Sequence, residues 1–286
     1  MLETVTILDL ETTGTDPETA QIVELATLDV GVDCSAQPVG TTMGYLRGQR
    51  INPGVSIPPE ASAVHHIVNA DVADAPKIED FVPYGCGEGL GAVDIIAGHN
   101  VAHYDLPIIR RLKGWPPEGV PILDTLRLAR HLWPDIPSHK LEVLRYRYGL
   151  HPTKSQMHEI REAGTDRPHG AAFDVVVTAN LLARAMMDVT IKMDGRDWMA
   201  YRTEGWRNVH EDPCGFGSTP MEAVADFSME TINVKEMKFG KHKGELVKDL
   251  PRDYIRWMFK QKDMEADNPD LFATIRRMYP PGTRGY

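Results

Sequence analysis

The sequence predicts an α/β domain with a mixed sheet over residues 1–190, and three observations support this class. Strand-like segments come first, and a short strand followed by helical segments comes after them, which is the element order of a mixed sheet. Several helical segments open with an acid or with prolines, which suit a first helical turn. The hydrophobic fraction of 42% is ordinary for a globular protein, so a chain of 286 residues can bury a sizeable core.

Four segments make up the first part of this domain. Alternating apolar residues predict a strand over residues 4–10, and a turn that begins at Gly14 leads to a second strand over 21–32. A third strand is expected over 42–50, and the three together predict an antiparallel meander. The prolines at the start of residues 58–67 then predict a short helix.

The second part of the domain begins after a glycine-rich stretch over residues 85–91, which predicts a linker. Residues 94–100 predict a short buried strand that ends in polar residues. Helices are expected to follow over residues 104–112, 123–132 and 141–148, and a further helix follows His169–Asp174 and ends near residue 187.

The remaining third of the chain predicts two smaller modules. Residues 191–228 predict a small ββα module, in which Thr219 caps the helix. Residues 229–286 predict an accessory module that is basic and aromatic. Residues 235–262 hold nine Lys and Arg against four Asp and Glu, a net charge of +5. This module therefore differs in charge from the chain as a whole.

Composition narrows the class of protein. The net charge is −10, which argues against non-specific binding of duplex nucleic acid by a basic surface. No apolar run is long enough to span a membrane, so no membrane partner is expected, and no signal peptide is recognisable. Cys34, Cys86 and Cys214 are scattered and lack metal-ligand spacing, which indicates a reduced, cytoplasmic compartment.

Two acids on the first strand are unusual for a core position. Asp9 and Glu11 lie on one strand face, shortly before Gly14. Buried carboxylates without a partner do not stay ionised, so a cation is expected beside them, and hard oxygen ligands suit Mg²⁺ or Mn²⁺. The alternative is an exposed edge strand with solvated acids.

Two more acids lie at predicted helix starts. Asp105 and Asp174 each begin a helical segment, and His169 precedes Asp174 by five residues in a loop. Each acid alone is equally well explained as a helix-end carboxylate stabilised by the helix dipole. We prefer that structural interpretation for Asp124, which has a similar position. The four other acids together at element ends favour a functional site; they are Asp9, Glu11, Asp105 and Asp174.

Three motifs carry a family resemblance. DLETTG, GHNVAHYD and HGAAFD occur in this order and resemble the motifs of the DEDD superfamily of 3′→5′ exonucleases. The histidine ahead of the last aspartate matches the DEDDh (DnaQ-like) subgroup, and INPGVSIPPEASAVHHI resembles a stretch that this family carries. Within the subgroup the chain is most similar to the exonuclease X and epsilon proofreading types, and less to RNase T. The resemblance covers residues 4–188 and implies an RNase H-like fold with a mixed five-stranded sheet flanked by helices.

The resemblance assigns roles to the motif residues. It implies that two divalent metal ions are bound by four acids and that His169 is the general base; the four ligands are Asp9, Glu11, Asp105 and Asp174. Two metals about 4 Å apart can hold the attacking and leaving oxygens of a phosphoryl displacement, and an imidazole can take the proton of the attacking water. The alternative for His169 is a solvated loop histidine.

The resemblance also implies contacts with the substrate. Thr12 and Thr13 would contact the terminal nucleotide, Leu10 would pack on its base, and the segment with His65 and His66 would help to hold base and sugar. For His65 the alternative is an ordinary histidine on a helix surface.

These observations predict a metal-dependent 3′→5′ exodeoxyribonuclease that releases 5′-mononucleotides in DNA repair or turnover. One alternative is a 3′→5′ exoribonuclease of the RNase T type, which differs in its tolerance of a 2′-hydroxyl. An alternative of another class is a proofreading subunit or scaffold that binds a DNA polymerase through residues 190–286. The expected partners are DNA 3′ ends, a polymerase or repair protein, and a second copy of the chain in a homodimer.

The end of the chain carries a second resemblance. Residues 236–279 resemble a small domain assigned to quorum-sensing-regulated virulence factors. Tyr254, Arg256 and Trp257 follow a basic turn, and aromatic side chains among cations can stack on bases and neutralise phosphates. We therefore expect an accessory nucleic-acid grip. The alternative is that Tyr254, Trp257 and Met258 form the core of the module, because their spacing fits one helix face.

Overall fold

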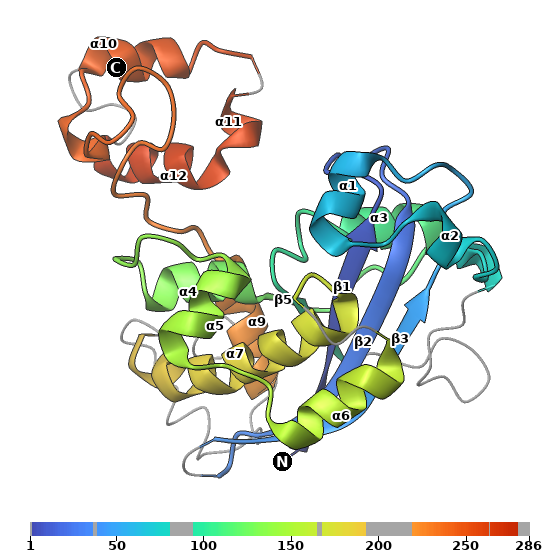
Figure 1. Cartoon of the computed structure of the whole chain (residues 1–286). Helices are drawn as coiled ribbons and strands as arrows, with labels where there is room; N and C mark the ends of the chain where they lie inside the picture. The colour runs from blue at the N-terminus through green and yellow to red at the C-terminus, as the bar shows by residue number, and fades with distance from the viewer. Residues whose placement is uncertain are drawn as a thin grey trace. The chain divides into compact units, whose positions relative to one another are not determined.

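A five-stranded mixed sheet with the order β3-β2-β1-β4-β5 is the centre of the N-terminal part of the chain (Figure 1). Its first three strands pair antiparallel, whereas β4 pairs parallel with β1 and β5 pairs parallel with β4. The predicted meander and the RNase H-like α/β class are therefore confirmed. The strands are β1 (Leu2–Thr12), β2 (Ile22–Asp33), β3 (Gly40–Arg50), β4 (Ile95–Gly98) and β5 (Ile122–Asp124).

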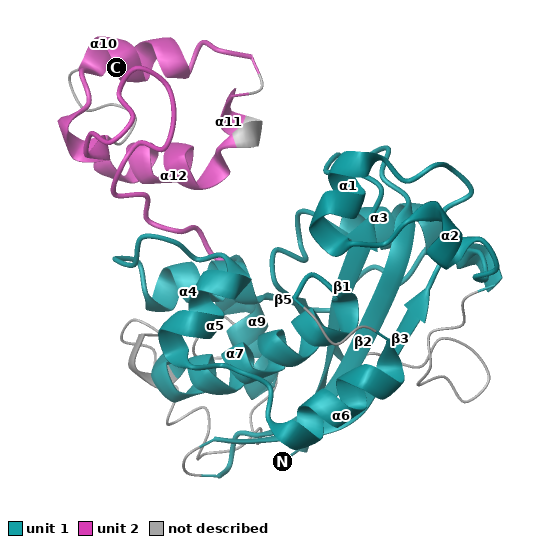
Figure 2. Cartoon of the chain, viewed as in Figure 1, with its two compact units in different colours: residues 1–229 teal, residues 230–286 magenta. Residues whose placement is uncertain are grey.

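The computed structural model describes residues 2–36, 39–80, 94–164, 168–192, 219–262 and 264–279. The chain divides into two units, residues 1–229 and residues 230–286, shown in teal and magenta in Figure 2. The linker predicted over 85–91 and both strands of the predicted ββα module lie outside the described residues. No helix in the described ranges is both long and apolar enough to cross a membrane.

Helices flank both faces of the sheet in the first unit. α7 is the longest and lies across β1, β2 and β3, while α4, α5 and α6 pack against α7. The helices are α1 (Pro59–His65), α2 (Asn69–Val72), the 3₁₀ helix η1 (Ile78–Asp80), α3 (Asp105–Lys113), α4 (Thr125–Leu132), α5 (Leu141–Tyr148), α6 (Lys154–Ala163), α7 (Ala171–Lys192) and α9 (Pro220–Met229).

The alternation of side chains along β1 creates two hydrophobic cores, one on each face of the sheet. Val5 and Ile7 are fully buried and pack in the core that α7 completes. Leu8 and Leu10 point to the other face, where they pack with buried residues of α3. The acids of β1 share the parity of Val5 and Ile7, so the strand directs them toward the α7 side of the sheet.

Two helix ends bear out their predicted caps. Asp124 is fully buried and caps α4, because its carboxylate accepts the N–H groups of Leu126 and Arg127 at 2.9 and 3.1 Å. The structural interpretation of this acid is confirmed. At the start of α9, the Thr219 hydroxyl accepts the N–H of Glu222 at 3.1 Å, and the Glu222 carboxylate accepts the N–H of Thr219 at 2.9 Å.

The helix expected in the ββα module packs within the first unit. α9 contacts β5 and α4, and the Ser228 hydroxyl accepts the N–H of Asp124 at 3.1 Å. The N–H of Met221 also donates to the carboxylate of Glu3 at 3.2 Å. The structure therefore groups this helix with the five-stranded sheet. A separate module over 191–228 stays a prediction, because residues 193–218 lie outside the described part.

The second unit has a core of its own. Its elements are η2 (Val247–Asp249), α10 (Arg252–Met258), α11 (Met264–Asp267) and α12 (Pro269–Met278). Met258 of α10, Phe272 and Ile275 of α12 and Met237 of the preceding segment are at most 1% exposed and pack together.

Candidate active site

Two strand residues and one helix residue bring their carboxylates together. Asp9 and Glu11 lie on the face of β1 that α7 covers, and Asp174 is in the first turn of α7. Carboxylate oxygens of the three acids lie within 4.8 Å of one another. Residues that are 165 positions apart in the chain, Asp9 and Asp174, are therefore neighbours because α7 begins over the end of β1.

Asp105, the fourth predicted ligand, lies beside this cluster and is held by the backbone of β1. It is the first residue of α3, is 4% exposed, and accepts the N–H of Leu10 at 3.0 Å. Because Leu10 stands between Asp9 and Glu11, this bond fixes α3 to the strand segment that carries both acids. The Leu10 side chain itself is 5% exposed and packs in the core on the opposite face.

Burial and the charges of nearby carboxylates raise the pKa values of all four acids. Burial is the largest cause in each case, and the charges of neighbouring carboxylates add to it. The pKa of Glu11 rises to about 9, and that of Asp9 rises well above its usual range. The pKa values of Asp105 and Asp174 rise to about 7.

This donor set fits a divalent cation. Carboxylate oxygens are the ligands that Mg²⁺ and Mn²⁺ prefer, and acids so close together stay ionised at neutral pH only beside positive charge. Arg145 of α5 does lower the pKa of Asp174, but its guanidinium is paired with Glu142 at 2.6 Å, and the Glu142 charge raises the same pKa. The protein side chains therefore leave a negative site that a metal ion can neutralise.

His169 lies in the loop immediately before α7, and its side chain is exposed. Its backbone has a φ of 59°, in the left-handed region that non-glycine residues seldom adopt. The N–H of His169 donates to the Asp174 carboxylate and lowers its pKa. The structure thus places the His169 peptide group against the acid cluster and leaves the imidazole at the surface.

Thr12, the last residue of β1, and Thr13 begin a tight turn that Tyr104 holds. The hydroxyls of Thr12 and Tyr104 are in hydrogen-bond contact, and both reach the C=O of Gly14, at 2.9 and 2.5 Å. Thr13 pairs with Gln21 through its own N–H and through its side-chain oxygen. Tyr104 was not among the predicted site residues. Its signal was its place next to Asp105, in the second motif.

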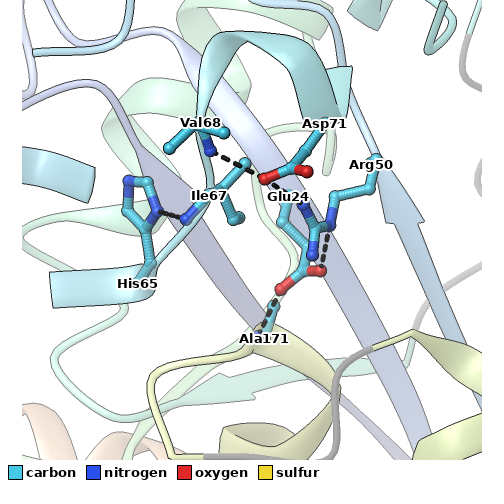
Figure 3. A network of polar contacts seen from close by, with 7 residues as sticks. All are labelled: Glu24, Arg50, His65, Ile67, Val68, Asp71 and Ala171. Atoms are coloured by element: carbon cyan, nitrogen blue, oxygen red, sulfur yellow. Dashed lines mark hydrogen bonds and ion pairs between the residues drawn. The ribbon is translucent and has the colours of Figure 1, made fainter. Parts of the chain in front are cut away.

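His65 is 2% exposed, so it is not a helix-surface histidine. Its Nδ1 accepts the N–H of Ile67 at 3.0 Å (Figure 3). This bond leaves Nε2 to carry the proton and donate to the C=O of Thr12 at 3.2 Å. Burial lowers its pKa and favours this neutral form. His65 therefore supports the Thr12 backbone, whereas His66 is exposed and ends α1 with a φ of 59°.

Sequence reasoning missed Glu24, a fifth buried acid near the cluster. Glu24 is 2% exposed on β2, accepts the N–H of Ala171 at 2.9 Å and pairs with the Arg50 guanidinium at 2.9 Å (Figure 3). Ala171 is the first residue of α7, so Glu24 caps the helix that carries Asp174. The Glu24 charge also raises the pKa values of Asp9, Glu11 and Asp174.

Arg50 extends this network to the next layer of the structure. Its guanidinium lies 3.9 Å from the Asp71 carboxylate, which accepts the N–H of Val68 at 2.9 Å (Figure 3). One signal in the sequence could have identified Glu24: it is a single acid within the apolar run of residues 22–28. A charge in the centre of a buried strand requires a partner.

Comparisons with known proteins give a family and several relatives. The family model described as "Exonuclease" matches residues 6–182, and the model described as "Putative quorum-sensing-regulated virulence factor" matches residues 227–267. Both resemblances stated from the sequence are therefore confirmed.

Two relatives and one solved structure illustrate these matches. Exodeoxyribonuclease 10 of Escherichia coli (strain K12) is 28% identical over 274 residues, which cover 94% of this chain and 96% of that protein. DNA polymerase III subunit epsilon of Aquifex aeolicus (strain VF5) is 25% identical over 205 residues, which cover 70% of this chain and 88% of that protein. A structure of exonuclease X in complex with 5′ overhanging duplex DNA is 29% identical, with a TM-score of 0.48, and the match covers 64% of this chain and 90% of that chain.

Proposed function

Because this chain belongs to the exonuclease family, whose model matches residues 6–182, we propose that it is a metal-dependent 3′→5′ exodeoxyribonuclease. It hydrolyses the terminal phosphodiester bond of a DNA strand and releases 5′-mononucleotides. The observation that carries the proposal is the convergence of Asp9, Glu11 and Asp174 within 4.8 Å, inside the region that the family model matches.

We assign the four motif acids as the ligands of two Mg²⁺ or Mn²⁺ ions. Their crowding and raised pKa values support this assignment, because four carboxylates can neutralise two divalent cations. When bound, the ions balance the charge of the phosphodiester and of its transition state and make water more acidic. The ligands in this assignment are Asp9, Glu11, Asp105 and Asp174.

The chain supplies the remaining steps of hydrolysis. We assign His169 as the general base that takes a proton from the attacking water, because histidine accepts protons readily near neutral pH and an exposed loop side chain can turn toward a substrate. Thr12 and Thr13 hold the terminal nucleotide, with His65 keeping the turn in place from behind. His66 is a further proposed substrate contact. The predicted contact of Leu10 is not assigned, because its side chain packs in the core on the opposite face of the sheet.

The choice of DNA over RNA rests on the relatives. The E. coli relative that covers 94% of this chain is an exodeoxyribonuclease by name. A role in DNA repair or turnover follows from that substrate, and the scattered cysteines support the cytoplasm as the compartment. An exoribonuclease of the RNase T type would use the same acids and differ in how it accepts a 2′-hydroxyl.

The test compares matched DNA and RNA single strands, each labelled at the 5′ end, in Mg²⁺. We expect a ladder that shortens from the 3′ end on DNA only, and its loss with EDTA. Asp174→Asn should lower the rate by at least about 100-fold. The matched control is Asp188→Asn on the same helix, whose carboxylate pairs with Arg184 at 2.9 Å away from the cluster. It should retain activity.

Other outcomes would separate the alternatives. A ladder on RNA would move the protein to the exoribonuclease class with the same site. Full activity of Asp174→Asn would contradict the ligand assignment. No cleavage of either strand would favour a proofreading subunit or scaffold, which co-purification with a DNA polymerase would then identify. Size-exclusion chromatography tests the predicted homodimer.

A further inference from the structure

The second unit exposes a tryptophan beside cationic side chains. Trp257 lies on α10 and is 47% exposed, although tryptophan is usually well buried. Its ring stacks on the ring of Tyr254, with centroids 5.3 Å apart and planes inclined by 20°. Tyr254 is 8% exposed and belongs to the core of the unit, as does Met258. Of the three residues whose spacing fits a core face, Trp257 therefore exposes its side chain, whereas Tyr254 and Met258 are buried.

Cationic side chains lie on the stacked Tyr254 and beside Trp257 in the chain. The Lys241 ammonium lies 5.1 Å from the centroid of the Tyr254 ring on which Trp257 stacks. Arg256 is adjacent to Trp257 and half-exposed, and Lys260 follows one turn later and is exposed. We refer to Lys241, Tyr254, Arg256, Trp257 and Lys260 as the Trp257 patch.

Asp253 is an acid close to the Trp257 patch, and its effect is small. Arg256 contacts Asp253 at 3.2 Å, but Asp253 is 92% exposed, and an ion pair so open to solvent contributes little and can rearrange. The net charge of +5 over residues 235–262 contrasts with −10 for the whole chain. The patch is thus a basic region on an acidic protein, which selects an anionic partner.

We propose that the Trp257 patch is a binding site for single-stranded nucleic acid. An unpaired base stacks on the exposed face of Trp257, and the Lys241 and Lys260 side chains neutralise the phosphates on either side. Paired bases in a duplex do not offer their faces for such stacking, so the site selects single strands. This inference rests on the proposed function, since the strand being degraded is the expected occupant.

The buried part of the patch explains why the site is rigid. The Tyr254 ring contacts both the Trp257 ring and the His242 ring, whose centroids lie 5.3 and 4.3 Å from its own. His242 in turn pairs with Glu245 at 2.9 Å. A stacking platform that is already fixed loses less conformational freedom when a base binds, which favours affinity.

The experiment measures equilibrium binding of a labelled oligo(dT) to the full chain in EDTA, so that no cleavage occurs. Trp257→Leu keeps an apolar side chain but removes the aromatic face, and we expect the Kd to rise about 5- to 100-fold. Trp257→Phe keeps an aromatic face, so its Kd should rise much less. Both variants leave the buried Tyr254 in place, and their melting temperatures check that the unit is folded.

Charge is tested separately through the salt dependence of binding. Lys241→Met combined with Lys260→Met should reduce the slope of log K against log salt by about 1.4, as expected for two lost phosphate contacts on a single strand. Arg277→Met is the matched control, because it removes a charge from α12 instead of the patch. The slope of this control should change less than that of the double variant.

Two outcomes would overturn the proposal. The first is a wild-type Kd for a folded Trp257→Leu protein. The second is equal binding of oligo(dT) and of a blunt duplex of the same length by the wild type. Hydrolysis of a dinucleotide, whose single phosphodiester bond must lie in the active site, reports the active site alone. If the wild type does not hydrolyse the dinucleotide but binds oligo(dT) through the Trp257 patch, the proposed function is contradicted and this inference stands.

Discussion

At the residue scale, the acid cluster makes the protein without metal less stable than its packing would allow. The acids are raised in pKa by burial and by one another, so the folded protein binds protons more tightly than the unfolded chain does. Glu11 shows the effect most clearly, since its pKa moves from an ordinary 4.5 to about 9. A residue that is required for metal binding is therefore also a residue that opposes folding until the metal arrives.

Melting temperatures measured over a range of pH in EDTA test whether the acid cluster opposes folding. For groups with raised pKa values, the stability is fully present below the unfolded values near 4 and is lost as the pH rises through the folded values up to about 9. We expect the melting temperature in EDTA to fall across this range. Mg²⁺ should raise it most at the alkaline end.

Glu11→Gln removes one charge from the cluster and provides the matched comparison. We expect it to stabilise the EDTA-treated protein by about 1–3 kcal/mol at pH 8, to weaken the stabilisation by Mg²⁺ and to lower activity by at least about 100-fold. Asp188→Asn should not change the stability in EDTA, the stabilisation by Mg²⁺ or the activity in this way. A Glu11→Gln protein that is less stable than the wild type in EDTA would argue against repulsion in the cluster.

At the scale of elements, the position of α7 depends on a cap that β2 supplies to its first residue. The N–H of Ala171 donates to Glu24 of β2, and Arg50 of β3 neutralises that carboxylate at 2.9 Å. Gly48, also on β3, approaches the end of α6 so closely that a Cβ there would lie 2.0 Å from the C=O oxygen of Ala163. Both contacts fix helices against β2 and β3, next to the loop that carries His169.

Removing the Glu24 side chain should therefore affect both stability and activity. Glu24→Ala leaves the N–H of Ala171 and the Arg50 guanidinium without their acceptor, and we expect a loss of about 2–4 kcal/mol in urea unfolding. Glu24→Gln keeps an acceptor for Ala171 and should lose less. Asp71→Ala is the control, since this more exposed acid should cost at most about 1 kcal/mol.

These elements also show what sequence reasoning can and cannot find. The first strand of the meander was predictable because apolar residues alternate along it, and the cluster was anticipated because Asp9 and Glu11 are costly in such a strand. α6 was missed because Ile160 is its one fully buried residue, so it lacks an apolar stripe. The capping pair of Thr153 and Gln156 was the available signal.

The position of the Glu24 partners could not be read from the sequence. Arg50 is 26 residues away and Ala171 is 147 residues away, and local patterns carry no information on such pairs. The same limit applies to His65, whose burial depends on its bond to the backbone of Thr12, 53 residues earlier. Motif residues could be predicted, but the contacts that hold them required the fold.

At the scale of the whole molecule, the chain combines a family domain with a second unit that has its own core. The E. coli exodeoxyribonuclease match extends over 94% of this chain. The second unit carries a net positive segment, so its contribution is expected in strand binding rather than in bond cleavage.

Deleting residues 230–286 tests this division of labour. The shortened chain ends after Met229, whose C=O accepts the Arg127 guanidinium at 3.4 Å, so the last helix of the first unit stays intact. We expect an unchanged rate on a dinucleotide, a KM for long single strands that rises roughly 10-fold, and a flatter salt dependence. An unchanged KM and salt slope would show that the second unit takes no part in substrate binding.

The separation of the acids along the chain has a consequence for protein synthesis. Asp9 and Glu11 leave the ribosome early, whereas Asp174 is added 165 residues later, about 8 to 33 s at ordinary rates of translation. Until then, the growing polypeptide holds only part of the ligand set. The nascent chain therefore cannot assemble the complete cluster while its first strands emerge from the ribosome.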